Sequence, residues 1–333
     1  RPPRSTLFPY TTLFRSHVSR PCKDSCPVDA ISYDEYGVSV IDEEKCIRCG
    51  QCAAKCPFGA IGTKTWITNV IADLKAGKKV YAILAPATEG QFGKDITMES
   101  WRQAVKKVGF EDLIEAGLGG DMTTCSEAEE WLEAYRNGEK KTTSCCPGFV
   151  NMIRKHYPDL ADMISTTVSP MCAVSRMIKA KDPDAVTVFV GPCVAKRKEA
   201  QRDEAVDFVM TFEEISSIFD AFEINLEIVQ PYAMEFSSVR EAHGFAQAGG
   251  VMGAVKAFLK MEADKINAIQ VSDLNKKNIG TLRAYAKSGK APGQFIEVMA
   301  CEGGCITGPS THSGSNNGKR QLVQELAKQK KTY

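Results

Sequence analysis

The chain has 333 residues, a net charge of +1 and 43% hydrophobic residues, which is typical of a globular protein with a substantial core. It has no basic block and no long apolar run, which argues against nucleic-acid binding and a membrane span. Thirteen cysteines are unusual in a chain too long to need disulfides. They predict metal or redox chemistry in a reducing compartment. We therefore expect a cytoplasmic protein without nucleic-acid or membrane partners.

The first sixteen residues have neither helical nor strand periodicity. Residues 6–16 resemble the conceptual translation of a sequencing-library adapter, so we exclude residues 1–16 from the fold as a probable artefact, with a disordered arm as the alternative. An artefact here implies that the natural protein begins earlier and is cut off near His17. We expect two domains after this segment, residues 17–64 and residues 65–333.

The first domain has too few apolar residues to fold by burial alone, although Ser39–Ile41 is a short predicted strand. It contains the pattern C-x2-C-x2-C-x3-C-P, the bacterial-ferredoxin run that binds [4Fe-4S] clusters. A zinc site usually has two paired C-x2-C hooks, so zinc is disfavoured. The cysteines of this run are Cys46, Cys49, Cys52 and Cys56.

Upstream, Cys22-x3-Cys26-Pro is the last third of a second such run. We expect Cys26 to complete the cluster held by the first three cysteines of the later run, and Cys22 and Cys56 to serve another cluster. Residues 16–19, where the other ligands of that cluster would lie, read Ser-His-Val-Ser. The sequence therefore predicts one complete N-terminal [4Fe-4S] cluster, and a second one in an untruncated protein.

Helical spacing of apolar residues from Trp66 to Leu74 predicts a linker helix that stops at Gly77. Buried strands then alternate with helices, which indicates an α/β domain with a largely parallel sheet. The predicted strands are Val80–Leu84, Val186–Val190, Phe208–Met210 and Phe295–Met299, and the predicted helices include 101–108 and 212–222. Residues 313–319 predict a flexible segment, followed by a short charged helix around Leu322 and Leu326.

Two of these strands run directly into cysteine motifs, and loops at strand C-termini are where α/β folds place their chemistry. The segments are TSCCPGF (143–149), PCVAKRKE (192–199) and EVMACEGGC (297–305). They supply four cysteines for a further cubane: Cys146, Cys193, Cys301 and Cys305. Neighbouring side chains diverge, so Cys145 needs another role, either as a proton-carrying thiol with an ordinary pKa near 8.5 or as an inert one.

These three segments resemble the signature segments of iron-only ([FeFe]) hydrogenases, in the same order, and the resemblance covers about residues 22–313. It implies an α/β fold, with a two-lobed catalytic domain of parallel sheets flanked by helices and a small α+β ferredoxin-like domain. It also implies the H-cluster, a [4Fe-4S] cubane linked to a di-iron unit with CO, CN⁻ and azadithiolate. The four cysteines would hold the cubane, and Cys305 would bridge to the di-iron unit.

The resemblance further assigns residues around the di-iron unit. Cys145 would pass protons to and from the azadithiolate, and Lys196 would donate to a cyanide, which suits a fixed ammonium in a dry pocket. The next two residues, Arg197 and Lys198, are better interpreted as solvated charges. The residues implied to line the cofactor pocket are Ala85, Pro86, Pro192, Phe245 and Met299.

A proton path implied by the family would run from Cys145 through Ser165 to Glu127 and Glu130, which are three residues apart on one helix face. Carboxylates with an intervening hydroxyl relay protons when they are partly buried. The alternative is that both glutamates belong to an exposed acidic face. The arginine that ends this path in well-known members is Ala134 here, so the exit to solvent is left open.

Other positions also depart from the best-known members, including Ala87, Met171 and Gly191. None of these changes removes a predicted cluster ligand. Cys125 and Cys172 are best interpreted as packing thiols, and His156, His243 and His312, which lack ligand spacing, as surface or structural residues.

The predicted function is therefore reversible reduction of protons to H2, with electrons from ferredoxin or a similar carrier. The resemblance implies maturation proteins as further partners, because thiolates alone cannot assemble the di-iron unit. Two alternatives remain: an H2-sensing relative with low turnover, and a relative that acts in iron–sulfur assembly without a di-iron site.

Overall fold

The computed structural model describes residues 20–265, 267–288 and 292–333. The predictions for residues 1–16 and for positions 16–19 lie outside this part of the chain. Among the described residues, no helix is both long and apolar enough to cross a membrane.

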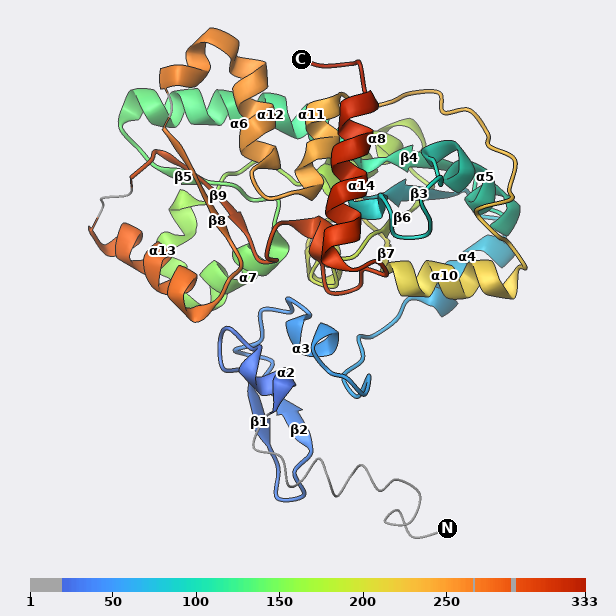
Figure 1. Cartoon of the computed structure of the whole chain (residues 1–333), viewed down its shortest axis with the longest axis horizontal. Coiled ribbons are helices and arrows are strands. Elements are labelled where there is room, and N and C mark those ends of the chain that lie inside the picture. Colours follow the sequence, from blue (N-terminus) through green and yellow to red (C-terminus); the bar gives the residue numbers. More distant parts are fainter. Residues whose placement is uncertain (1–19, 266, 289–291) are drawn as a thin grey trace.

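The cysteine-rich domain is built from very short elements: α2 (Pro21–Asp24), β1 (Ile31–Tyr33), β2 (Ser39–Ile41) and α3 (Gln51–Ala54). The two strands form an antiparallel hairpin, as the Tyr36–Gly37 turn suggests, and Gly37 has φ of +77° there. In Figure 1 this domain hangs below the larger one, with α3 on the side that faces it. The predicted strand at Ser39–Ile41 is confirmed.

The larger domain contains two parallel sheets, as predicted from the alternating pattern. The first sheet has the order β4-β3-β6-β7, with strands Asp112–Glu115, Val80–Leu84, Val186–Val190 and Phe208–Met210. Successive side chains of a strand point to opposite faces, so Ala82 and Ile83 belong to different cores. Helices cover both faces: α4 (Ile67–Lys75), α5 (Met98–Val108) and α10 (Phe212–Ala221) on one, and α6 (Ala116–Asn137) and α8 (Pro170–Lys181) on the other.

The second sheet has the order β5-β9-β8, with strands Lys141–Thr142, Phe295–Met299 and Ala268–Ser272. On one face α7 (Pro147–His156) and α13 (Lys276–Ser288) pack against Ile296 and Val298. On the other face α6 and α12 (Gly250–Leu259) pack against Phe295. Helix α6 therefore contributes to both sheets, which lie side by side as two lobes in Figure 1.

The remaining elements connect the lobes around the ends of the strands. They are η1 (Pro86–Thr88), η2 (Pro158–Met163), α9 (Lys196–Ala200), α11 (Arg240–His243), η3 (Gly244–Ala246), η4 (Lys260–Lys265), η5 (Cys305–Thr307) and α14 (Ser315–Lys328). Leu322 of α14 packs with Ala87, Ala246 and Ile306, which follow different strands and helices. Helix α14 thus closes the seam between the two lobes (Figure 1).

Two local predictions need correction. The segment 313–319 is not an irregular linker, because α14 already begins at Ser315 and Gln91 accepts hydrogen bonds from the backbone of His312 and Ser313. The helix predicted from residue 101 begins at Met98, since the Thr97 side chain caps it by accepting from the Ser100 amide at 3.3 Å.

Candidate functional site

A mainly apolar cavity of about 70 Å³ lies at the C-terminal ends of the strands, where ligands bind in α/β folds. Segments that follow β3, β6 and β9 all reach it, together with the start of α8 and the turn at η3. All five residues predicted to line a cofactor pocket border this one cavity, namely Ala85, Pro86, Pro192, Phe245 and Met299. The fold thus gathers residues from seven separate segments.

The four cysteines predicted to hold a cubane converge next to this cavity. Burial raises the pKa of the Cys305 thiol to about 12, and the neighbouring Cys193 and Cys146 thiols add to the shift. Burial likewise raises the pKa of Cys301, to which Cys305, Cys193 and Cys146 contribute. The backbone N–H of Ala300 donates to the Cys146 sulfur at 3.3 Å. The four thiols are therefore buried near one another.

Cys145 and Cys146 point to different surroundings, as neighbouring side chains must. Cys146 belongs to the thiol set, whereas Cys145 lines the apolar cavity together with Cys305 and Lys196. Burial raises the pKa of Cys145 well above its ordinary value, and the Glu127 carboxyl adds to the shift. The thiol is therefore protonated at neutral pH, with its proton beside the cavity.

Lys196 also lines the cavity, and its ammonium is tightly held. Nζ donates to Glu199 Oε2 at 2.6 Å and to the Cys145 carbonyl at 3.3 Å. Burial by itself lowers the pKa of Lys196, but Glu199 raises it to a net value above the ordinary one. A permanent positive charge thus faces an apolar space. Sequence reasoning missed Glu199, although a glutamate three residues after a helical lysine is a recognisable pairing signal.

The proposed proton path is present in part. Glu127 is 2% exposed, which rules out the exposed acidic face for this residue. Ser165 donates to Glu130 Oε2 at 2.5 Å, and Lys141 lies 3.5 Å from Glu130 Oε1. Ser165 therefore pairs with Glu130, and no hydrogen bond joins it to Glu127 in the part of the chain that the structure describes.

Glu127 occupies an environment that suits proton transfer. Burial, followed by the Glu297 and Glu130 carboxyls, raises the pKa of Glu127 to about 8. Burial also raises the pKa of Glu297 to about 7, although the amides of Gly249 and Met252 donate to it. A carboxyl with a pKa near neutrality can both accept and release protons. No local sequence signal points to Glu297, which lies inside strand β9.

A second cavity of about 350 Å³ opens beside this path and offers it contact with solvent. Its lining includes Ser165 on one side and Glu199 and Cys172 on another. Cys172 is buried, with its sulfur 3.6 Å from Ser169 Oγ and 3.8 Å from Glu199 Oε1, in line with a packing thiol. Ala134, at the family's usual exit, is buried. Protons can therefore reach Ser165 without an arginine at position 134.

One predicted solvated charge is in fact buried. Arg197 is 8% exposed and its guanidinium binds Glu214 Oε2 at 2.5 Å and the Thr63 hydroxyl at 2.6 Å. The prediction failed because Glu214 and Thr63 are distant in sequence. Lys198 keeps a partly exposed position, bonded to Gln201.

The N-terminal cysteines form a second thiol set. Burial is the main cause that raises the pKa of Cys49 to about 12, and the thiols of Cys52, Cys26 and Cys46 add to it. These are the four cysteines expected to share one cluster. Cys22 instead contacts the Tyr33 hydroxyl at 3.2 Å, and the Cys56 sulfur accepts the Ala60 amide at 3.3 Å.

Both thiol sets fit iron–sulfur clusters by their chemistry, since four cysteine thiolates are the usual donor set of a cubane. Within the described ranges, no three His, Cys, Asp or Glu side chains are placed to share a single metal ion. His243 is buried against Glu115 at 3.1 Å and so is structural, as expected.

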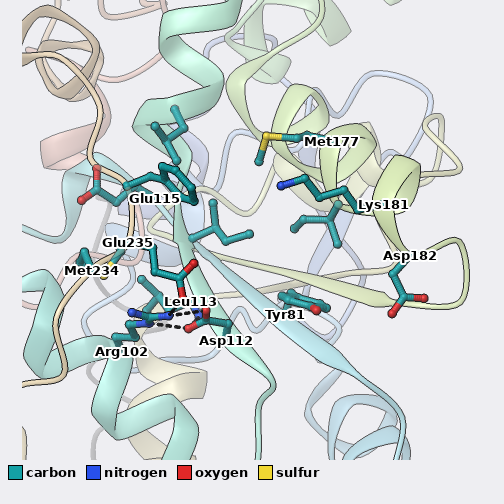
Figure 2. Close-up of a pocket in the computed structure, with 14 residues that line it drawn as sticks. Tyr81, Arg102, Asp112, Leu113, Glu115, Met177, Lys181, Asp182, Met234 and Glu235 are labelled. Carbon is teal, nitrogen blue, oxygen red and sulfur yellow. Dashed lines mark hydrogen bonds and ion pairs between the residues drawn. The ribbon is translucent and has the colours of Figure 1, made fainter.

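Figure 2 shows a different pocket, of about 240 Å³, along strand β4. Arg102 is one of the residues that line it, and its guanidinium is bound to both Asp112 oxygens at 2.6 Å and to Glu235 at 3.0 Å. None of the residues that line this pocket is a cysteine. It therefore has no evident link to the cysteine chemistry.

Comparison with known proteins agrees with this site. The family model "Iron only hydrogenase large subunit, C-terminal domain" matches residues 78–309, and an "LdpA Fe-S cluster-binding domain" model matches residues 15–67. The first match spans more than half of the chain. The chain therefore belongs to the iron-only hydrogenase large-subunit family, with an iron–sulfur-binding domain before the catalytic one.

Curated relatives are of two kinds. The chain is 29% identical to iron hydrogenase 1 of Clostridium pasteurianum, over 90% of this chain and 69% of that protein. It is 27% identical to the NADP-reducing hydrogenase subunit HndD of Solidesulfovibrio fructosivorans, but spans only 55% of that subunit. It is also 25% identical to the cytosolic Fe-S cluster assembly factor narfl of Danio rerio, over 67% of this chain.

Solved structures confirm the fold. The structure titled as stepwise [FeFe]-hydrogenase H-cluster assembly in HydA(deltaEFG) superimposes with a TM-score of 0.66 over 80% of this chain and 91% of that one, at 21% identity. The predicted α/β catalytic domain with parallel sheets flanked by helices is thereby confirmed.

Proposed function

We propose that this protein is an [FeFe] hydrogenase that interconverts protons and H2, with electrons from ferredoxin or a similar small carrier. The observation that carries the proposal is the apolar cavity in which a protonated thiol, Cys145, and a fixed ammonium, Lys196, stand beside the candidate ligand Cys305. A chain that only stored or passed on a cubane would not need such a cavity.

Different residues would bind the two parts of the H-cluster. Cys146, Cys193, Cys301 and Cys305 would hold the cubane, and Lys196 would donate to an anionic ligand of the di-iron unit in the cavity. When bound, this group supplies the electron and hydrogen chemistry, which no amino-acid side chain provides. The surrounding apolar side chains keep water out and strengthen each polar contact.

The chain's own residues move the proton. Cys145 holds a proton at Sγ on the cavity wall, and the Glu127 carboxyl, which acts on that thiol, exchanges protons near pH 8. Glu130 and Ser165 then connect to the outer cavity. Protons would thus leave through this cavity, whereas electrons would enter through the N-terminal thiol set.

An infrared spectrum tests this proposal. Protein co-produced with the hydrogenase maturation proteins is expected to show CO and CN⁻ absorption bands and to exchange deuterium between H2 and D2O. A preparation with full iron–sulfur content but without these bands would overturn it. An H2 sensor with low turnover would show the bands but only slow exchange.

The second candidate, an iron–sulfur assembly factor, is favoured by the narfl relatives. In that case the four thiols of each set would bind cubanes, and no di-iron unit would enter the cavity. Cys145 and Lys196 argue against it, because both reach the same apolar cavity as the candidate ligand Cys305. The same infrared experiment separates the two functions.

A further inference from the structure

The segments that carry the two thiol sets are in contact with each other. The loop Cys46–Gly50 of the cysteine-rich domain packs against the first turns of α7, which begins directly after Cys146, and against Val194, which follows Cys193. At this contact each of the two segments has a glycine where a larger residue would clash.

Gly50 is the first of these glycines. It has φ of +81°, and a Cβ added to it would lie 2.6 Å from Val194 Cγ2 and 2.8 Å from Pro309 Cγ. Both distances are far below van der Waals contact, so any side chain here pushes the Cys49 loop away from the catalytic domain. Gly50 also follows Cys49, so a shift of the backbone moves that thiol.

Gly148 is the second glycine, in the first turn of α7. An added Cβ would lie 3.1 Å from Ala300 Cβ, 3.8 Å from Cys49 Cβ and 4.0 Å from Cys146 Sγ. Gly148 thus stands between one cysteine of each set, without a side chain of its own. Its neighbour Ala300 precedes Cys301, so crowding here would also disturb the β9 end of the site.

Polar contacts fix the same interface. The buried Asn151 donates from Nδ2 to the Ile47 carbonyl at 3.0 Å. One turn further along α7, Lys155 Nζ donates to the Cys46 carbonyl at 2.9 Å, and the His156 ring lies 2.8 Å from the Lys45 carbonyl. Three residues of α7 therefore hold the ligand loop 45–47, so the helix and the loop move as one unit.

We propose that Gly50 and Gly148 are positioning residues for electron transfer, and that their contact sets the separation between the group held by Cys49 and the group held by Cys146. The proposal rests on the proposed function. One electron leaves the N-terminal iron–sulfur group, which is oxidised, and reduces the group in the catalytic domain. No bond forms or breaks in this step, so distance and contact govern its rate.

Two matched variants isolate the contact. Gly50→Ala is compared with Gly37→Ala, because Gly37 has a similar φ of +77° in the same domain but has nothing within 4 Å of an added Cβ. Gly148→Ala is compared with Gly253→Ala in α12, where an added Cβ also meets nothing within 4 Å. Each control carries the same chemical change without the contact.

The first readout is the magnetic interaction between the two reduced iron–sulfur groups, measured by electron paramagnetic resonance at equal iron content. The second is the ratio of carrier-driven H2 evolution to H2/D2O exchange, since exchange needs no electron from the carrier. We expect Gly50→Ala and Gly148→Ala to weaken the interaction and lower this ratio severalfold, and both controls to match the wild type.

The inference would be overturned if both contact variants kept the wild-type magnetic interaction and the wild-type ratio of H2 evolution to exchange. An equal loss of either quantity in Gly37→Ala would overturn it as well. If Gly50→Ala fails to fold, Gly148→Ala decides, and Gly50→Ala/Val194→Ala removes one of the two clashing groups and is expected to recover part of the interaction. A wild-type protein without H2/D2O exchange would instead refute the proposed function. The magnetic interaction would then still test the contact.

Discussion

The cysteine-rich domain and the catalytic domain are each stabilised by a different kind of interaction. Within residues 20–64, only three apolar side chains are fully buried, Ala30, Ile31 and Ile47. The catalytic domain has apolar cores on both faces of each sheet. A small domain without a core depends on metal binding for its folding free energy, whereas a packed α/β domain does not. Under the proposed function, iron would therefore be a structural element in the first domain and a reactive one in the second.

Removal of iron is the largest test of this difference. A chelator is expected to unfold residues 20–64, because their folding free energy comes from cluster binding, and to leave β3 and β6 folded. Amide hydrogen exchange followed by mass spectrometry measures both regions in one sample. Full protection of β1 and β2 in iron-free protein would show that the domain folds by packing alone.

Cys145→Ser tests the proton-transfer role proposed for the catalytic domain. A serine hydroxyl gives up its proton far less readily than a thiol, so H2 turnover is expected to fall by about 10²–10⁴-fold, the usual contribution of a positioned acid–base group. Iron content and infrared bands should stay at wild-type levels. Cys22→Ser, in the other domain, is the comparison. Full activity of Cys145→Ser would exclude this thiol from proton transfer.

Glu127→Ala is expected to slow turnover by about 10²-fold, because it removes the carboxyl next to Cys145. Glu129→Ala, on the exposed side of the same helix, is the control. An unchanged rate in Glu127→Ala would remove this glutamate from the path.

Glu127 also predicts a pH dependence of stability. Burial raises the pKa of Glu127 from 4.5 to about 8, so the folded state binds this proton more tightly than the unfolded chain does. Stability is therefore lost as pH rises from about 4.5 to about 8. Glu127→Gln cannot titrate, and its denaturant midpoint is expected to fall less over this range. Parallel curves for the two proteins would contradict the assignment.

The smallest expected effect is the difference in stability caused by breaking two ion pairs. Arg197–Glu214 is buried, with side chains 10% and 11% exposed, whereas Arg48–Glu43 is at the surface, with 46% and 64%. Arg197→Gln is expected to lower the free energy of unfolding by about 3–5 kcal/mol, because a buried charge loses its partner. Arg48→Gln should cost less than about 1 kcal/mol. Equal losses in urea denaturation would show that burial does not separate these pairs.

Much of this molecule could be predicted from sequence because its signals are local. The C-x2-C-x2-C spacing specifies cluster ligands, and short β-branched runs bounded by turn residues marked strands β3, β6, β7 and β9. Helix α6 was predicted only around Glu127 and Glu130, because it packs against both lobes and so lacks a single apolar stripe. The environments of Arg197 and Glu297 were missed for the same kind of reason, since their burial depends on partners far away in the chain.

The sequence by itself determined the donor atoms: which cysteines exist, how they are spaced, and that a lysine and a second thiol accompany them. Only the tertiary structure decided how those groups meet. It buried Glu127, paired Lys196 with Glu199, and formed an apolar cavity from seven separate segments. It also brought Gly50 against Val194 and Gly148 against Cys49. Spacing along a chain fixes local geometry, whereas burial and contact between distant segments arise only when the sheets and helices pack.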